Sequence, residues 1–516
     1  MKARTHLSAN LFLPVAIGAA VLMTLGAAAA RADVKLPGIF SDHMVLQASA
    51  AVPVWGWAEP GENVAVSVAG QSLACQADKD GKWIVKLNQL KPTAEPQTLT
   101  VKGKNTVIVS DVLVGEVWLA SGQSNMAFLV NRGLNAEEEK SAAHYPGLRM
   151  FTVTRSPQRT PQADCSGRWE VCGPETVGNF SAVAYFFGRD LHQRLGIPVG
   201  VINSSYGGTD IAAWTSQEAQ SKSPELQGQI DKWLSSDAAY DPAQAKATYE
   251  KQLAAWKTKV RQAKAAGKPA PRKPRQQAQP ARDPNFPTNL YNGMIAPLIP
   301  YSLRGAIWYQ GEHNTSRLEL AELYGQQLPL LVEDWRSRWG SDFPFAWVQL
   351  PNLDRKDFRP LVRDAMLQSL RVKNTGMAVT IDIGEPGDNH PKNKQEVGRR
   401  LALWALGTVY GQKVPATSGP LPAGHKTRGS EVVLSFTHTD GGLVAKGGEL
   451  RGFQIAGADK VWKPAQAKID GADVIVGNPD VKQPVAVRYA WAGNPDCNLY
   501  NGAGLPASPF RTDDWK

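Results

Sequence analysis

The chain has 516 residues, which at the usual ~100–200 residues per domain predicts roughly two to four domains with ample hydrophobic core. Its composition, 42% hydrophobic and 20% charged with 47 Gly and 36 Pro, excludes a disordered polymer and indicates a turn-rich globular protein. The net charge of +10 taken alone suggests an anionic partner such as nucleic acid, so the placement of that charge decides its meaning.

Residues 1–32 are typical of a signal peptide. Lys2 and Arg4 precede a short apolar stretch, and Ala30 and Ala32 are the small residues that a signal peptidase needs. We predict cleavage after Ala32 and a periplasmic or secreted mature protein, with a retained N-terminal anchor as the alternative. No later segment has the ~18–20 uninterrupted apolar residues of a membrane-spanning helix, so no membrane span is expected after cleavage.

The cysteines bear on redox state and metals. Export would place them in an oxidising compartment, where Cys165 and Cys172 are close enough in the sequence to be a candidate disulfide. No CxxC motif or Cys/His ligand spacing is present, so zinc is disfavoured and no metal or other cofactor is predicted.

Residues 33–110 have a strand pattern. Short alternating segments such as VPVWGWA, VAVSV and KWIVKL are separated by Gly, Pro and an Asp80-Gly81 turn signal. This pattern predicts an all-β module resembling a sandwich.

Residues 111–415 follow a different pattern, in which apolar β-branched runs alternate with helical segments. Such alternation is typical of a parallel sheet covered by helices on both faces. We therefore predict a three-layer α/β/α domain with a parallel five-stranded sheet. The expected strands are 112–120, 199–203, 304–310, 345–350 and 377–383.

The helices of this domain have clear end signals. Ser181 can cap a helix that Gly196 ends, and further helices are expected over 318–339 and 361–372. The last helix is expected to begin with Pro391, which would place His390 at its N-terminus, where the helix dipole favours a neutral ring.

Two further segments complete the organisation. An insertion over about 215–290 contains one probable helix, with Tyr249 and Trp256 on one face, followed by a Pro-rich tail. Alternation returns after the α/β domain, so residues 416–516 are predicted to form a second all-β module.

Polar or small residues follow four of the five expected strands. A lone serine there is usually a helix cap, paired glycines are usually a turn, and a lone histidine is usually a cap. Their convergence on the carboxyl edge of one parallel sheet, where such folds bind ligands, predicts an active site instead. The residues are Ser124, Gly207 and Gly208, Gln310 and Glu312, and Asp388 and His390.

The blocks around these residues resemble the successive motifs of the sialate O-acetylesterase family, a branch of the SGNH/GDSL hydrolases. The blocks are GEVWLASGQSNM (115–126), SSYGGTDIAAW (204–214), WYQGEHN (308–314) and DNHPKNKQEVGRRLALWAL (388–406). The flanks LPGIFSDHMVLQ (36–47) and AVRYAWAGNPDCNLYNGAGLPASPFRTD (486–513) are similar to the family as well. The resemblance covers nearly the whole chain after residue 32 except the insertion.

The resemblance implies an SGNH-type carbohydrate acetylesterase. Ser124 would attack the acetyl carbonyl, His390 would move the proton, and water would hydrolyse the acetyl-enzyme. The oxyanion would be held by the Ser124 N–H, the Gly208 N–H and the Gln310 side chain. Residues expected to contact the substrate are Asn125, Tyr206, Gly207, Glu312 and Asn314.

Three departures from the family pattern bear on these roles. The superfamily usually spaces its acid and base as Asp-x-x-His, whereas here the interval is Asp388-x-His390, so Glu312 or a Ser–His dyad are alternatives to Asp388. Gln310 stands where relatives in the wider superfamily commonly use Asn, as a glutamine does in the sialate O-acetylesterase branch itself. Tyr206 stands where the branch often has Trp, which would alter the wall for the acceptor sugar.

The natural ester, either a sialic acid or an acetylated plant polysaccharide, stays open at this point, as does the oligomeric state. A non-catalytic carbohydrate-binding protein on a hydrolase scaffold is one alternative function, but the intact Ser124, Gln310 and His390 argue against it. A short-chain lipid esterase is another, and no apolar lid segment supports it.

The net charge is local. Residues 1–32 carry +3 and residues 251–282 carry +10, so subtracting both from the total of +10 leaves −3 for the rest. Nucleic acid is therefore not an expected partner. The basic insertion is interpreted as a solvated surface excursion, with attraction to an anionic surface or polysaccharide as the alternative.

Overall fold

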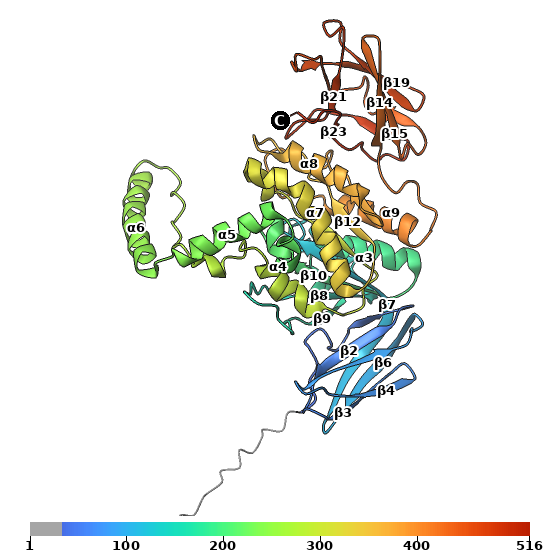
Figure 1. The fold of residues 1–516 in the computed structure, drawn as a ribbon. Coiled ribbons are helices and arrows are strands. Elements are labelled where there is room, and N and C mark those ends of the chain that lie inside the picture. The colour runs from blue at the N-terminus through green and yellow to red at the C-terminus, as the bar shows by residue number, and fades with distance from the viewer. Residues whose placement is uncertain (1–32, 516) are drawn as a thin grey trace, which may run out of the picture.

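The computed structural model describes residues 33–515, so the expected signal peptide over 1–32 lies outside the described residues. The fold is mixed α/β, with one large central sheet and several smaller β-sheets. Figure 1 shows the N-terminal strands at one end, the C-terminal strands at the other, and the helix-covered sheet between them. None of the described helices combines the length and the hydropathy needed to cross a membrane.

The central sheet has the strand order β13-β12-β11-β7-β10-β8-β9, and within the described chain every neighbouring pair along it is parallel except β8 with β9. The strands are β7 (Thr106–Gly122), β8 (Tyr145–Thr152), β9 (Trp169–Cys172), β10 (Val199–Ser205), β11 (Gly305–Tyr309), β12 (Phe345–Val348) and β13 (Thr375–Ala378).

The expectation of five parallel strands was too low by one. Each of the five expected strands overlaps an observed one, although β13 ends at Ala378 and not at 383 as expected, and β8 adds a sixth parallel strand beside β10. The sequence pattern missed β8 because it opens with Pro146-Gly147, which is a turn signal, and because its buried run is only four residues long.

β7 joins the N-terminal strands to the central sheet. Its first half pairs antiparallel with β6 (Thr93–Lys102), and its second half pairs parallel with β10 and β11. The boundary expected at residue 110 therefore falls inside one continuous strand. The other N-terminal strands are β1 (Val45–Gln47), β2 (Val52–Trp57), β3 (Asn63–Val68), β4 (Gln71–Gln76) and β5 (Lys82–Leu87).

Helices cover both faces of the central sheet. On one face Trp118 of β7 packs against Phe187 of α3 (Ala182–Leu195) and Trp404 of α9 (Lys394–Trp404). On the other face Trp308 of β11 packs against Trp335 of α7 (Leu318–Trp339), which lies beside α8 (Arg359–Gln368).

Two helix starts test the expected end signals. Ser181 caps α3 as expected, because its hydroxyl oxygen accepts the Ala184 N–H at 3.2 Å. The expected start of the last helix at Pro391 was wrong: α9 begins at Lys394, and the Asn393 side chain caps it by accepting the Glu396 N–H. His390 is therefore four residues before the helix rather than at its first turn.

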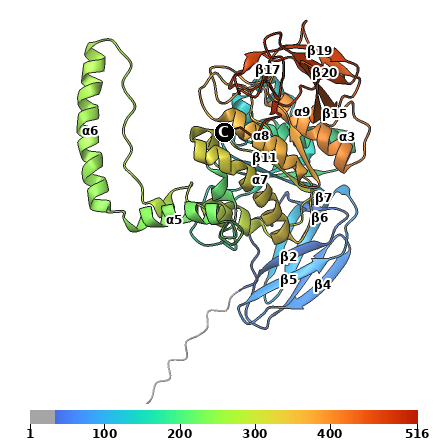
Figure 2. The ribbon, with the colours of Figure 1, turned by 45° about the horizontal axis from the view of Figure 1, so that its top comes forward.

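The insertion contains more helix than expected. α4 (Gln217–Gln220) and α5 (Pro224–Ala238) precede α6 (Pro242–Ala265), which is the helix expected around Tyr249 and Trp256. Figures 1 and 2 show α5 leading away from the sheet and α6 standing apart from the rest of the molecule. The Pro-rich tail returns along α6, where the Trp256 indole N–H donates to the Pro271 carbonyl at 2.7 Å.

The C-terminal strands form separate small sheets, which agrees with the alternation read from the sequence. They are β14 (Leu421–Arg428), β15 (Glu431–Thr437), β16 (Leu443–Ala445), β17 (Phe453–Ala456), β18 (Lys463–Pro464), β19 (Gln466–Asp470), β20 (Asp473–Gly477), β21 (Ala486–Tyr489), β22 (Leu499–Asn501) and β23 (Phe510–Arg511). Two short helices, α1 (Ala136–Ser141) and α2 (Pro174–Val177), lie between β7 and β8 and between β9 and α3 in the chain.

The expected disulfide is wrong in this structure. Cys165 and Cys172 are both buried free thiols. Cys172 closes β9 opposite Tyr145, whereas Cys165 lies in the irregular segment before β9, beside Gly38. Burial raises the pKa of both thiols to about 12, so neither is reactive at neutral pH.

Candidate active site

Ser124 lies just past the carboxyl end of β7. Gly122 ends the strand at φ +136°, and a Cβ added there would lie 2.1 Å from the Tyr309 carbonyl oxygen, so only glycine fits this turn. The chain then turns through Ser124, which is half-buried, into the fully buried Asn125. This turn places the serine hydroxyl at the edge where the sheet brings its loops together.

His390 reaches Ser124 from the loop between β13 and α9. Its Nε2 lies 2.9 Å from the Ser124 Oγ, which is hydrogen-bond distance. Its Nδ1 lies 3.7 Å from the Asp388 Oδ1, and that same oxygen accepts the His390 backbone N–H at 2.8 Å. Asp388 therefore faces the ring nitrogen and holds the main chain of the histidine loop.

Glu312, the alternative acid, is placed differently. It is buried, and its Oε1 accepts a hydrogen bond from the Asn125 Nδ2. Its Oε2 has no hydrogen-bond partner in the described chain. No hydrogen bond or ion pair among the described residues joins Glu312 to His390, so the geometry favours Asp388 as the acid beside the histidine.

Asn125 links the serine turn to the histidine loop. Its Nδ2 donates to Glu312 and to the Asn389 carbonyl oxygen at 3.0 Å, and its Oδ1 accepts from the Lys394 Nζ at 2.5 Å. All of its polar atoms are occupied and its side chain is buried. The expectation that Asn125 binds substrate is therefore wrong, because its amide holds protein groups instead.

Lys394 is a buried charged residue that the sequence analysis did not single out. It is fully buried in the first turn of α9, with its ammonium group 5.0 Å from the centre of the Phe128 ring and 5.2 Å from that of Tyr309. Burial lowers the pKa of Lys394 to about 7, although the nearby Glu312 carboxylate favours the charged form. Its place in the block 388–406 was the only sequence signal for it.

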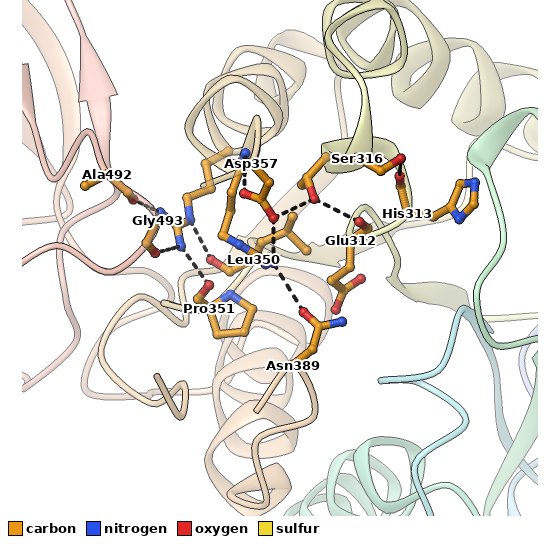
Figure 3. A network of polar contacts seen from close by, with 12 residues as sticks. Glu312, His313, Ser316, Leu350, Pro351, Asp357, Asn389, Ala492 and Gly493 are labelled. Carbon is orange, nitrogen blue, oxygen red and sulfur yellow. Dashed lines mark hydrogen bonds and ion pairs between the residues drawn. The ribbon is translucent and has the colours of Figure 1, made fainter. Parts of the chain in front are cut away.

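The histidine loop is also held from the side of α8. The Arg359 Nη2 donates to the Asn389 Oδ1 at 3.2 Å and to the Asp357 Oδ2 at 3.3 Å (Figure 3). Asn389 is thus bound on one side by Asn125 and on the other by Arg359. No local sequence pattern predicts this contact, because Arg359 belongs to α8 and is far from the histidine loop in the sequence.

The C-terminal segment joins the same network. The buried Arg363 donates to the carbonyl oxygens of Ala492 and Gly493 and also to those of Leu350 and Pro351 (Figure 3). Burial, followed by the repulsion of Arg359, lowers the pKa of Arg363 to about 9. The C-terminal strands are therefore tied to the helix that positions the histidine loop.

The glycine pair after β10 lies beside the serine. A Cβ added to Gly207 would lie 3.2 Å from the Ser124 Cβ, and Gly208 adopts φ +73°. Among the hydrogen bonds of the described chain, none uses the backbone N–H of Ser124, Gly207 or Gly208. These free donors match the expected oxyanion-binding role of the Ser124 and Gly208 N–H groups.

Gln310 does not match its expected role. It is fully buried, and its Nε2 donates to the Thr209 carbonyl oxygen at 2.8 Å and to the Asn314 Oδ1 at 2.7 Å. Both amide hydrogens are used, so neither is left for an oxyanion. The expected donor is instead a brace for the glycine loop, and the buried Asn314, which also donates to Asp210, is not free to bind substrate either.

Tyr206 lies beside the turn that carries Ser124, and its expected role as a wall for the acceptor sugar stays a prediction. It is half-buried, its N–H donates to the Gly122 carbonyl oxygen at 3.0 Å, and the exposed Arg155 guanidinium lies 5.2 Å from its ring centre. Arg155 was not expected from the sequence. In the described part of the chain, no group of three or more His, Cys, Asp or Glu residues is arranged to hold a metal ion.

Known proteins resemble this chain over most of its length. Residues 280–406 match the family described as carbohydrate esterase, sialic acid-specific acetylesterase. The sialate O-acetylesterase of Mus musculus is 30% identical, covering 92% of this chain and 94% of the relative, and that of Homo sapiens is 31% identical, covering 92% of each. A carbohydrate acetylesterase from Xanthomonas citri has a similar structure, with a TM-score of 0.78 and 36% identity over 94% of this chain and 100% of that chain.

Proposed function

Because this chain belongs to the sialate O-acetylesterase family, we propose that it uses Ser124 as the nucleophile that hydrolyses O-acetyl esters of carbohydrates. The family makes it a carboxylic ester hydrolase, and the similar structure is that of a carbohydrate acetylesterase. The observation that carries the proposal is the 2.9 Å contact between the Ser124 Oγ and the His390 Nε2.

The proposed reaction has two halves. As the Ser124 Oγ attacks the acetyl carbonyl carbon, His390 Nε2 accepts its proton and then donates it to the departing sugar oxygen. The freed sugar leaves an acetyl ester on Ser124. Water then attacks that ester, gives a proton to His390, and releases acetate as the proton returns to the serine oxygen.

We propose that the negative oxygen formed in each half is held by backbone N–H groups. The free N–H groups of Ser124 and Gly208 are the donors, and Gln310 supports them by fixing the Thr209 carbonyl at 2.8 Å. Loss of one such donor typically lowers turnover by ~10²–10³. Asp388 is proposed to orient His390, because it lies opposite the Nδ1 and bonds the loop N–H.

The test of this function is acetate release from a panel of esters. The panel contains O-acetylated sialic acids, acetylated xylan and xyloglucan oligosaccharides, and short-chain lipid esters. The wild type is expected to release acetate from at least one saccharide and Ser124→Ala from none. Equal release by both proteins would reject Ser124 as the nucleophile, and the ranking of the saccharides identifies the substrate class.

We further propose that residues 1–32 export the protein and are removed after Ala32. Lys2, Arg4 and the apolar stretch before Ala30 support this proposal. N-terminal sequencing of the protein recovered from the periplasm should begin at Asp33. We also propose that residues 111–415 form an SGNH-type domain between β-modules at 33–110 and 416–516. Because β7 runs through the first boundary, limited proteolysis should cut near residue 416 and not near residue 110.

A further inference from the structure

A cavity of about 260 Å³ lies between α5 and the loops that surround Ser124. Its walls come from four places: the loop after Gly208, the segment 285–287, the start of α7 with the turn before it, and one side of α5. The lining includes Asp210, Lys232, Trp233, Ser236, Asn285 and His313.

The cavity is attached to the catalytic loops by direct hydrogen bonds. The Asn285 Nδ2 donates to the Gly208 carbonyl oxygen at 3.2 Å, and its Oδ1 accepts the Asp210 N–H at 2.7 Å. On the opposite wall the His313 N–H donates to the Gln123 Oε1 at 3.2 Å, next to Ser124 in the chain. A group in this cavity is therefore close to the ends of the loops that hold the nucleophile.

The wall that α5 contributes is packed against the rest of the molecule on one side. Leu226 and Ile230 of α5 are buried, and the half-buried Trp233 packs against the Phe286 ring with 5.5 Å between centres. Lys232 also forms an ion pair with Glu319 at 2.5 Å, between α5 and the start of α7; both side chains are exposed, so the pair adds little stability. The packing of α5 and of Trp233 thus defines this wall of the cavity in the folded chain.

The chemistry of the lining fits an uncharged sugar ring. Trp233 provides an aromatic surface, and the side chains of Asp210, Ser236 and His313 provide donors and acceptors around it. The charges in the lining are balanced, with Asp210 and Glu319 against Lys232 and Arg317. In Figure 3 His313 points away from the network of Asp357 and Asn389 that holds the histidine loop.

We propose that this cavity binds a neutral sugar residue of an oligosaccharide substrate, next to the acetylated residue at Ser124. The inference rests on the proposed carbohydrate esterase function and assigns to the insertion a part in substrate binding. α5, although it lies outside the parallel sheet, then selects saccharides by length, whereas the serine and histidine act on the ester itself.

The test is binding of two unacetylated probes, sialyllactose and xylotetraose, measured by titration calorimetry. Trp233→Ala removes the aromatic surface, and Ser236→Trp fills the cavity while leaving Trp233 in place. Each is expected to weaken the tighter-binding probe about three- to tenfold, the usual value of one aromatic contact. Trp256→Ala on α6, outside the cavity, is the matched control and is expected to leave binding unchanged.

The same variants should hydrolyse 4-nitrophenyl acetate, which has no sugar, at the wild-type rate. Unchanged probe binding in both cavity variants, equal weakening in the Trp256→Ala control, or no binding of either probe to the wild type would each overturn the inference. Ser124→Ala should bind the probes as the wild type does. If Ser124→Ala still releases acetate, the proposed nucleophile is wrong while the binding result stands.

Discussion

Two groups of residues in the candidate active site differ in burial. The serine side is Asn125 with its partners Glu312 and Lys394, and the histidine side is Asp388 and His390. Asn125 and Lys394 are 0% exposed and Glu312 is 7% exposed, whereas the side chains of His390 and Asp388 are 34% and 51% exposed. Buried polar groups are costly when their partners are removed, while exposed ones can turn to water. The serine side therefore sets the geometry, and the histidine side is open to the substrate and to the attacking water.

The largest expected effect comes from the exposed side, because His390 carries out the chemistry. His390→Ala should lower kcat on an acetylated saccharide by about 10⁴–10⁶, as the loss of a triad histidine does in serine hydrolases. The melting temperature should hardly change, since the ring is only partly buried. His313→Ala is the control, with both variants also measured on 4-nitrophenyl acetate: His390→Ala should lose this activity and His313→Ala should keep the wild-type rate. A similar loss in both variants on this ester would contradict the assignment.

The largest effect on stability is expected from the buried side. Asn125→Ala leaves the Lys394 ammonium and the Glu312 carboxylate without their shared partner. Hydrogen bonds to charged groups contribute about 1.5–3 kcal/mol each, so we expect a loss of roughly 2–4 kcal/mol in the free energy of unfolding by denaturant. The exposed Asn131→Ala is the control, with less than about 0.5 kcal/mol; equal losses would show that burial does not separate the two sides.

Lys394 gives the buried side a dependence on pH. Its pKa is about 7 in the folded chain against 10.5 as the ordinary value, so between these pH values the unfolded chain binds a proton that the folded chain does not. Stability should therefore rise with pH through this window, by at most about 1.4 kcal/mol per pH unit. Lys394→Met should flatten that rise between pH 7 and 9, measured by denaturant unfolding; an unchanged slope would mean that Lys394 stays charged.

A smaller effect is expected for the acid. The Asp388 side chain is 51% exposed, and its Oδ1 accepts a hydrogen bond from the backbone N–H of His390. Because solvent weakens its interaction with the His390 ring, Asp388→Asn should lower kcat only about tenfold. Glu312→Gln should affect stability more than turnover, because Glu312 contacts Asn125 and not the histidine. If Glu312→Gln abolished turnover while Asp388→Asn did not, the assignment of Asp388 would be wrong.

The position of the site was predictable from the sequence, but the role of each side chain in it was not always predictable. The meeting of Ser124, Gly208 and His390 was predictable, because parallel strands bring their carboxyl ends to one edge. The function of Gln310 was not, since its amide is satisfied by Thr209 and Asn314, which only the folded loops bring to it. A residue type at a strand end does not tell whether its donors are already used.

The same limit applies to the fold. The cap of α3 and the positions of four expected strands follow from local pattern and were confirmed, whereas β8 was missed and β13 ends five residues early. The start of α9 was also wrong, because the Asn393 side chain and not Pro391 begins the helix. The burial of Lys394 was also not predicted from the sequence. A lysine is usually solvated, and here the hydrogen bond to Asn125 and the contacts with two aromatic rings offset part of the cost of burying it.

The smallest effect on catalysis is expected for the most exposed polar region, the basic face of α6. Replacing Lys257, Lys259, Arg261 and Lys264 by Gln should leave kcat/KM on a neutral saccharide unchanged, because these side chains are exposed on a helix that stands apart from the catalytic loops (Figure 2). Charge substitution is preferable to deletion, since the Pro-rich tail returns along α6 and is bonded to Trp256. Retention on a sulfated resin at low salt should fall in the variant, because exposed charges act over about a Debye length. Unchanged retention would show that these four of the ten positive charges in residues 251–282 do not attract an anionic polymer.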